Sequence, residues 1–388
     1  MTSRIRLLVL LVTAPVIAFA LVGGVLAKAI AGSETYQHLR VFEDVVSLIA
    51  ANYVEDADMD RVMRGAMRGL AEGLDADSGY LSAEEVKGAE SGERALAGEV
   101  GIELTRNYYL RVIAARDQSP AARAGLRPGD FVRAIDGKPT REMSVFEGTR
   151  LLRGAPGSKV TLLVIRGNAA EPHSVDLVRE ALTAPDVSGR LEAGKTGYVR
   201  IAAFGPRVAK EVAARAAELA RAGATGLVVD VRDTATGALD AGIAVARLFV
   251  PAGTLAYREV RGAAREPIVA SPGDGAITLP AVVLVNDGTS GAAELFAAAL
   301  AGNNRTTLVG ERTQGRAALQ KLVRLPDGTG MLISNAWYLT PAGAPIHEKG
   351  LAPAVAVEVQ EVEFGAPPPS TAPILEKGLE QLRAAIKS

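Results

Sequence analysis

The sequence contains no cysteine. This absence excludes disulfide bridges, thiol catalysis and thiolate metal sites, and it makes the fold independent of the redox state of its compartment. Histidine is scarce as well: the three residues His38, His173 and His347 are scattered, without the spacing of a metal site. The formal net charge of −1 gives no electrostatic footprint for nucleic acid. We therefore expect no cofactor, no metal and no nucleic-acid partner.

The chain has the composition of a folded protein. Of its 388 residues, 48% are hydrophobic and 22% are charged, which excludes an intrinsically disordered chain. This length is enough for two or three domains.

The N-terminus predicts export. Arg4 and Arg6 precede an uncharged run over residues 7–27, which is long enough to span a bilayer with the arginines on the cytoplasmic side. Ala27-Lys28-Ala29 is similar to a small-x-small cleavage site. Residues 1–32 are therefore interpreted as a signal peptide or membrane anchor. We expect the rest of the chain on the periplasmic side of the inner membrane, either anchored or processed.

Residues 33–95 are predicted to be helical. Apolar residues three and four positions apart define one helix face: Leu39, Phe42, Val45, Val46, Ile49 and Ala50. A second helical pattern over 58–74 begins with Asp58, a candidate N-cap. The pattern predicts a helical hairpin, and the segment contains no catalytic or ligand-binding motif.

Residues 96–182 change to short strands and turns. The stretch "SPAARAGLRPGDFVRAIDG" (119–137) closely resembles a PDZ domain of the circularly permuted bacterial kind. This resemblance implies capture of protein or peptide C-termini by strand addition, with backbone N–H groups holding the carboxylate. The expected peptide-binding residues are Val100, Gly101, Ile102, Leu104, Val145 and Thr149. The alternative is that these apolar residues only form the core of a small domain.

Residues 183–364 have the alternation of an α/β unit. A helical pattern over 207–223 lies between strand patterns at 195–204 and 226–232, and the second of these is the apolar run of a covered strand. Residues 365–388 are a Pro-rich linker followed by a C-terminal helix.

Residues 285–300, "VNDGTSGAAELFAAAL", have the form of a strand, a turn and a helix that carries a catalytic serine. Together with "LDADSGYLS" (74–82) and the order of segments, they resemble the C-terminal processing (tail-specific) peptidase family over roughly residues 35–362. The resemblance implies an α+β multidomain fold: an N-terminal helical segment, a PDZ β-domain, a ClpP/crotonase-like α/β core and a short C-terminal helix. It also implies a Ser-Lys dyad, in which a neutral lysine takes the serine proton.

The dyad positions carry the wrong residues. The family motif N-x-G-[ST]-A-S-A-S-E places the nucleophile three residues before Glu294, and that residue is Gly291. The family spacing places the base at Arg316, whereas Gln320, four residues further on, keeps the family identity. Glycine has no nucleophile, and arginine keeps its proton at any workable pH. The resemblance therefore predicts a degenerate dyad.

The turn expected to form the oxyanion hole departs from the family pattern too. It consists of Thr236 and Gly237, and Thr236 stands where the family has a glycine. Ser290 is the fallback nucleophile. It lies one residue before the family position, which turns its side chain by about 100° on a helix start.

Three functions follow from these observations. The leading hypothesis is an envelope pseudo-peptidase that binds protein C-termini and acts as an adaptor or regulator, with an active peptidase relative as a further partner. The alternative is an active serine-type endopeptidase that cleaves near protein C-termini. In a third interpretation the α/β unit is a scaffold for a homo-oligomer assembled through the terminal helical segments.

Overall fold

The computed structural model describes residues 34–91, 98–167, 171–360, 362–366 and 372–387. The chain divides into two compact units between Gly69 and Leu70. The predicted signal or anchor at 7–27 lies outside the described residues. Within them, no helix is long and apolar enough to cross a membrane.

The first unit contains helix α2 (Glu34–Asn52) and most of helix α3 (Met59–Glu72). Asp58 caps α3 as expected, because its Oδ1 accepts a hydrogen bond from Arg61 N at 3.0 Å. The helical prediction for 33–95 is wrong at residues 79–81, where strand β1 (Gly79–Leu81) precedes helix α4 (Ala83–Ser91). The physical reason is tertiary: β1 pairs with a strand more than two hundred residues later, which no local periodicity reveals.

Residues 98–180 form a small β unit of short strands and turns, as the sequence predicts. Its strands are β2 (Ile102–Asn107), β3 (Tyr109–Ala115), β4 (Phe131–Ile135), β5 (Lys138–Pro139), β6 (Lys159–Ile165) and β7 (His173–Val178). They are ordered β2-β3-β4-β6-β7, with β5 beside β4. Ser119 and Ser144 cap helices α5 (Pro120–Arg123) and α6 (Val145–Leu152) through their side-chain oxygens.

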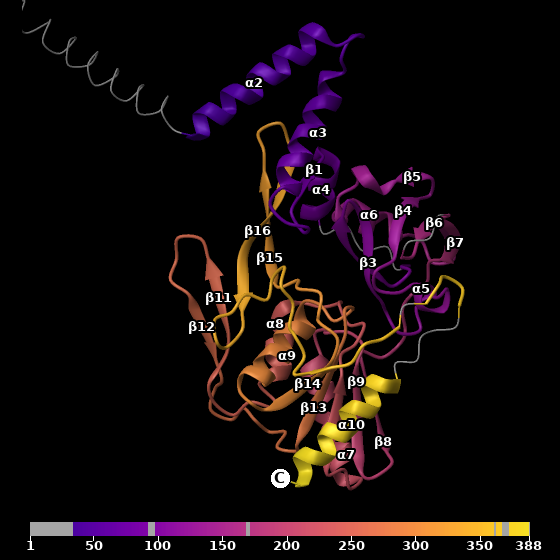
Figure 1. Ribbon diagram of the computed structural model, residues 1–388, viewed down its shortest axis with the longest axis vertical. Helices are drawn as coiled ribbons and strands as arrows, with labels where there is room; N and C mark the ends of the chain where they lie inside the picture. The colour runs from indigo at the N-terminus through magenta and orange to yellow at the C-terminus, as the bar shows by residue number, and fades with distance from the viewer. Residues whose placement is uncertain (1–33, 92–97, 168–170, 361, 367–371, 388) are drawn as a thin grey trace, which may run out of the picture. The chain divides into compact units, whose positions relative to one another are not determined.

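Residues 187–356 contain the α/β core. Its six-stranded sheet has the order β17-β14-β13-β10-β9-β8, parallel except for the pairing of β8 with β9. The strands are β8 (Val187–Glu192), β9 (Thr196–Ile201), β10 (Gly226–Asp230), β13 (Ala281–Val285), β14 (Thr306–Gly310) and β17 (Val355–Ala356). Its helices are α7 (Val208–Arg221), α8 (Leu239–Ala246) and α9 (Ala292–Gly302). Helix α10 (Ala372–Lys387) follows later in the chain and also packs against this sheet (Figure 1).

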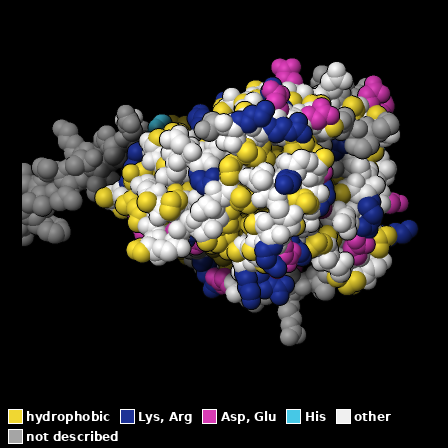
Figure 2. Space-filling view, turned by 90° about the horizontal axis from the view of Figure 1, so that it is seen from below, with side chains coloured by type: hydrophobic (Ala, Val, Ile, Leu, Met, Phe, Trp, Pro, Cys, Tyr) yellow, Lys and Arg dark blue, Asp and Glu magenta, His cyan; other side chains and the backbone are white. Residues whose placement is uncertain are grey.

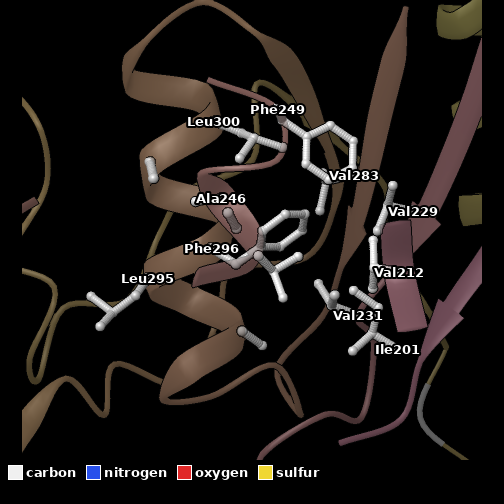
Figure 3. Close-up of a cluster of buried hydrophobic side chains, with 14 of the residues drawn as sticks. Ile201, Val212, Val229, Val231, Ala246, Phe249, Val283, Leu295, Phe296 and Leu300 are labelled. Carbon is white, nitrogen blue, oxygen red and sulfur yellow. The ribbon is translucent and has the colours of Figure 1, made fainter. Parts of the chain in front are cut away.

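Both faces of this sheet are covered, because alternate side chains of a strand point to opposite faces. Val229 and Val283 pack with Phe296 of α9 in the larger core cluster. Figure 3 shows these side chains between the helix and the strands. Val228 instead packs with Ile374 of α10 in a second cluster. Burial on both faces explains why β13 is a continuous apolar run and why β10 has no polar side chain before its last residue, Asp230.

A second sheet of the core reaches back to the N-terminal part of the chain. Its path is β1-β16-β11-β12, and β15 also pairs with β16. The added strands are β11 (Thr254–Val260), β12 (Glu266–Val269), β15 (Ala318–Arg324) and β16 (Gly330–Leu339). Pairing of Gly79 with Leu332 fixes the segment just before β1 on the core. This segment contains Asp77.

The surface mixes both signs of charge. Figure 2 shows Lys and Arg side chains interspersed with Asp and Glu over the face that it presents. This distribution agrees with the net charge of −1.

Candidate functional site

Two turns meet at the carboxyl edge of the parallel sheet. Strands β10 and β13 are parallel neighbours, so the chain leaves both at the same edge, and the turns 231–237 and 286–291 lie against each other. Ser290 N donates to Thr234 O at 2.9 Å, and Thr289 Oγ1 donates to Val231 O at 2.8 Å. The segment 285–300 therefore enters a tight, hydrogen-bonded elbow at this edge, as its sequence predicts.

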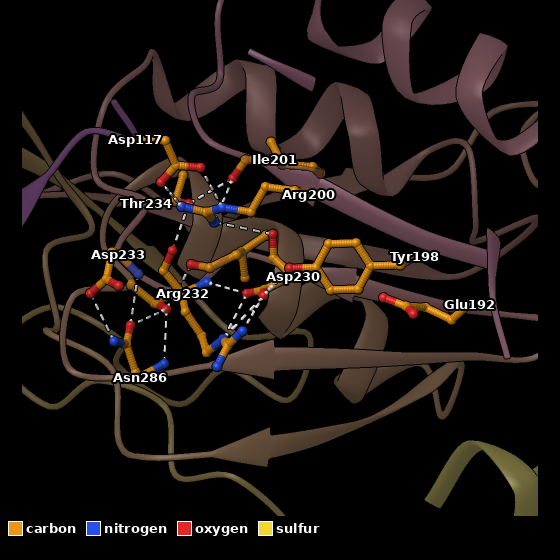
Figure 4. Close-up of polar contacts among 12 residues, drawn as sticks. Asp117, Glu192, Tyr198, Arg200, Ile201, Asp230, Arg232, Asp233, Thr234 and Asn286 are labelled. Atoms are coloured by element: carbon orange, nitrogen blue, oxygen red, sulfur yellow. Dashed lines mark hydrogen bonds and ion pairs between the residues drawn. The ribbon is translucent and has the colours of Figure 1, made fainter. Parts of the chain in front are cut away.

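A buried polar network holds the first of these turns (Figure 4). Asp233 N donates to Asn286 Oδ1, and Asn286 Nδ2 donates to Asp233 Oδ1, both at 2.8 Å. Arg200 makes a bidentate pair with Asp117 of the small β unit at 2.9 and 2.8 Å. Its Nη1 also donates to Thr234 Oγ1 at 2.9 Å. The turn is therefore connected both to the elbow and to the small β unit.

Gly291 occupies the position of the expected nucleophile. It is the N-cap residue of α9, with φ 63° and ψ −117°. Glycine adopts this conformation without strain, whereas residues with a side chain rarely adopt it. A Cβ built here would meet its nearest neighbour, Arg316 O, at 3.7 Å, which is ordinary contact. The elbow thus has room for a side chain, and this chain provides none.

The carboxylate of Glu294 joins the elbow to the loop that carries Arg316. Its Oε2 accepts from Gly291 N at 3.0 Å and from Arg316 N at 2.8 Å. Its Oε1 accepts from Gly315 N at 2.7 Å and from Thr313 Oγ1. Burial raises the pKa of Glu294, while these four hydrogen bonds act in the opposite direction. One buried carboxylate therefore fixes both dyad positions relative to each other.

Arg316 is engaged in ion pairs at the expected base position. Its Nε donates to Asp77 Oδ1 at 2.8 Å, and its Nη1 lies 4.0 Å from Glu103 Oε2. Asp77 comes from the segment before β1, and Glu103 comes from β2 of the small β unit. A guanidinium has no lone pair free to accept a proton and therefore cannot act as the base for a serine.

Thr236 and Gly237 lie at the other side of this cluster. Thr236 Oγ1 donates to Glu103 Oε1 at 3.1 Å, while its carbonyl accepts from Phe204 N at 2.8 Å. A Cβ at Gly237 would lie 2.3 Å from Phe204 O, so close approach of the backbone requires glycine there. The turn has thus kept Gly237, but its first glycine position carries a side chain that is used in a hydrogen bond.

Ser290 and Gln320 do not complete a dyad. Ser290 is 1% exposed, and its Oγ has no hydrogen-bond partner among the described residues. An attacking hydroxyl needs a base within hydrogen-bonding reach and access to substrate. Gln320 donates to Ser334 Oγ at 3.3 Å across the β15–β16 pair.

The expected peptide-binding residues lie in the small β unit. Val100, Ile102 and Leu104 are buried in its hydrophobic cluster, and Val145 packs against that cluster from α6. Thr149 lies on the same helix and is half-buried. Gly101 has φ +74°, and its carbonyl accepts from Arg116 N at 2.8 Å. The Gly101 turn therefore has the left-handed conformation that a glycine turn of this kind requires.

Sequence reasoning missed Asp77 and Glu103. Glu103 alternates with two predicted inward-facing residues of β2, so the period of a strand places it on the opposite face. That signal was present in the sequence. Asp77 was not foreseeable in the same way, because its position depends on the distant pairing of β1 with β16.

Comparisons with known proteins agree with this architecture. The model of peptidase family S41 matches residues 195–357, and a PDZ domain model matches residues 111–166. The chain is 36% identical to the carboxyl-terminal-processing protease of Synechocystis over 272 residues, 68% of this chain and 64% of that one. It is 30% identical to the carboxy-terminal-processing protease of Bartonella bacilliformis over 332 residues, 84% of this chain and 76% of that one.

A solved structure supports the same conclusion about the fold. The photosystem II D1 C-terminal processing protease superposes with a TM-score of 0.69 at 27% identity. The match covers 82% of this chain and 92% of that one. The mixed α+β multidomain fold expected from the sequence is therefore confirmed.

Proposed function

Because the chain belongs to the carboxy-terminal-processing proteases of peptidase family S41, we propose that it is a catalytically inactive member that binds protein C-termini through its PDZ domain. One observation carries the proposal: residue 291 has no side chain, although the elbow around it has space for one. The expected base, Arg316, is paired with Asp77. Neither half of a nucleophilic dyad is present at these positions.

The binding function rests on the PDZ domain. Such domains capture a free C-terminus by adding it as a strand and holding its carboxylate on backbone N–H groups. The Gly101 turn and strand β2 provide the matching elements here. An inactive protein of this kind acts as an adaptor or regulator, because it holds a C-terminus without cleaving it.

The test compares two forms of one peptide that ends in a small apolar residue. The free acid should bind more tightly than the C-terminal amide by about 1.5–3 kcal/mol, the range for hydrogen bonds to a charged group. Titration calorimetry measures the difference, and mass spectrometry of the same sample should recover the peptide intact. Equal affinities would rule out carboxylate capture, and cleavage of the peptide would rule out an inactive protein.

We further propose that residues 7–27 hold the protein at the inner membrane with its bulk in the periplasm. The uncharged run and the preceding arginines support this topology. A periplasm-only reporter fused to Ser388 should be active in membrane-associated form. Activity of a cytoplasm-only reporter at the same position would contradict it.

A further inference from the structure

Two departures from the family pattern reach the same carboxylate. Thr236 replaces a glycine and donates to Glu103 Oε1 at 3.1 Å. Arg316 replaces a lysine, and its Nη1 lies 4.0 Å from the other oxygen of Glu103. The two residues come from different turns of the core, yet both approach one side chain on strand β2 of the PDZ domain. If the two catalytic positions had been lost independently, there would be no reason for both replacement side chains to contact Glu103.

Asp77 is the second acidic partner of Arg316. Its side chain is 3% exposed and lies 2.8 Å from Arg316 Nε. The loop around it is ordered by Asp75, whose Oδ1 accepts from Asp77 N at 2.9 Å and from Ser78 N at 2.6 Å. Arg316 therefore contacts two chain segments that lie far from it in sequence.

The electrostatic balance of the cluster depends on the guanidinium. Burial raises the pKa of Glu103, whereas Arg316 and the hydrogen bond from Thr236 lower it. Without Arg316, the buried carboxylate of Asp77 would lose its ion pair, and the half-buried carboxylate of Glu103 would lose one of the two arginines that lower its pKa. An unpaired buried charge is strongly destabilising. The side chain of Arg316 is 27% exposed, so solvent compensates only part of such a loss.

We propose that Arg316, Thr236, Glu103 and Asp77 form a clamp that fastens strand β2 of the PDZ domain and the 75–78 loop to the α/β core. Position 316 thus has a structural role that is incompatible with catalysis. A lysine that accepts a proton must be neutral, and carboxylate partners such as Asp77 and Glu103 would keep it charged. The clamp is distinct from the Arg200–Asp117 pair, which joins the PDZ domain to the core through another turn.

The central variant is Arg316→Met, and Arg312→Met is its matched control. Arg312 lies on the same loop, is exposed, and donates only to Lys349 O among the contacts that the structure describes. The clamp predicts that Arg316→Met raises the unfolding equilibrium constant about tenfold to hundredfold, measured by urea denaturation. Arg316→Met should also accelerate hydrogen exchange of the β2 amides. Arg312→Met should leave the unfolding equilibrium constant and the exchange rates nearly unchanged.

A double-mutant cycle separates the clamp from a general packing effect. In an Asp77→Asn background, Arg316→Met should raise the unfolding equilibrium constant much less than in the unmodified protein. The reason is that an asparagine at this position carries no charge that the loss of Arg316 could leave unpaired. The penalty should also shrink as the pH falls toward about 4, the ordinary range of a carboxyl group. The sign follows from linkage: losing Arg316 raises the folded-state pKa of Glu103, so the variant gains stability on protonation.

The outcomes are decisive in both directions. Additive effects of Arg316→Met and Asp77→Asn, or a pH-independent penalty, would overturn the clamp. If Arg316→Met does not fold alone, folding of the Arg316→Met/Asp77→Asn pair supports the clamp, and failure of both refutes the coupling. These measurements monitor folding and exchange, so the clamp can fail while the absence of proteolysis stands.

Discussion

Restoring the dyad is expected to produce proteolysis only when Asp77 is neutralised as well. Gly291→Ser places a hydroxyl in the open elbow, and Arg316→Lys supplies a base that can lose its proton. However, Asp77 lies 2.8 Å from the guanidinium that the lysine would replace. A carboxylate so near raises a lysine pKa, by about 1–3 units for a close opposite charge. The lysine would then remain protonated.

The Gly291→Ser/Arg316→Lys/Asp77→Asn variant should therefore exceed the two-residue variant by about tenfold or more, as the neutral fraction of lysine rises. Adding Thr236→Gly should raise activity further, since one missing oxyanion donor costs about 10²–10³ in rate. The assay is cleavage of a C-terminally tagged unfolded substrate. Gly291→Ser alone and Arg316→Lys alone are the controls, and both should stay at background. Background activity in all folded revertants would contradict the assignment of positions 291 and 316.

Glu294→Gln is expected to be the most destabilising single substitution in the elbow. The carboxylate accepts hydrogen bonds from Gly291 N, Gly315 N, Arg316 N and Thr313 Oγ1, whereas one end of an amide can only donate. At least one buried donor would face another donor without a partner. We expect a loss of about 2–4 kcal/mol in the free energy of unfolding, from the cost of unpaired buried groups that had bonded to a charge.

Urea denaturation of Glu294→Gln beside Glu380→Gln provides the test. Glu380 is 63% exposed in an ion pair with Lys377 on α10, so its substitution should change stability by less than about 0.5 kcal/mol. A loss below about 1 kcal/mol at Glu294 would show that its carboxylate does not hold the two loops together.

The sequence predicted local features well where the physics is local. Asp58 caps its helix as predicted, and the apolar residues 226–229 lie in a strand at the centre of a covered sheet. The elbow at 286–291 was predictable because a strand, a turn and an Ala-rich helix follow one another directly. These elements depend on capping, on turn chemistry and on the period of side chains.

The clamp could not be predicted in the same way. Asp77 meets Arg316 only because β1 pairs with β16, and that register depends on contacts between distant parts of the chain. Glu103 differs from Asp77, because the period of strand β2 places it on the face opposite Ile102 and Leu104 but does not identify its partners in the core. The polar face of the same strand contains the contact with the core.

The most direct test of inactivity is labelling of the exported fragment with a serine-directed phosphonate, followed by peptide mapping and the tagged-substrate assay. We expect no adduct and no cleavage in the unmodified protein, and the same result for Ser290→Ala. This follows because Ser290 is buried and position 291 has no hydroxyl. An adduct on Ser290, with cleavage that Ser290→Ala abolishes, would contradict the account.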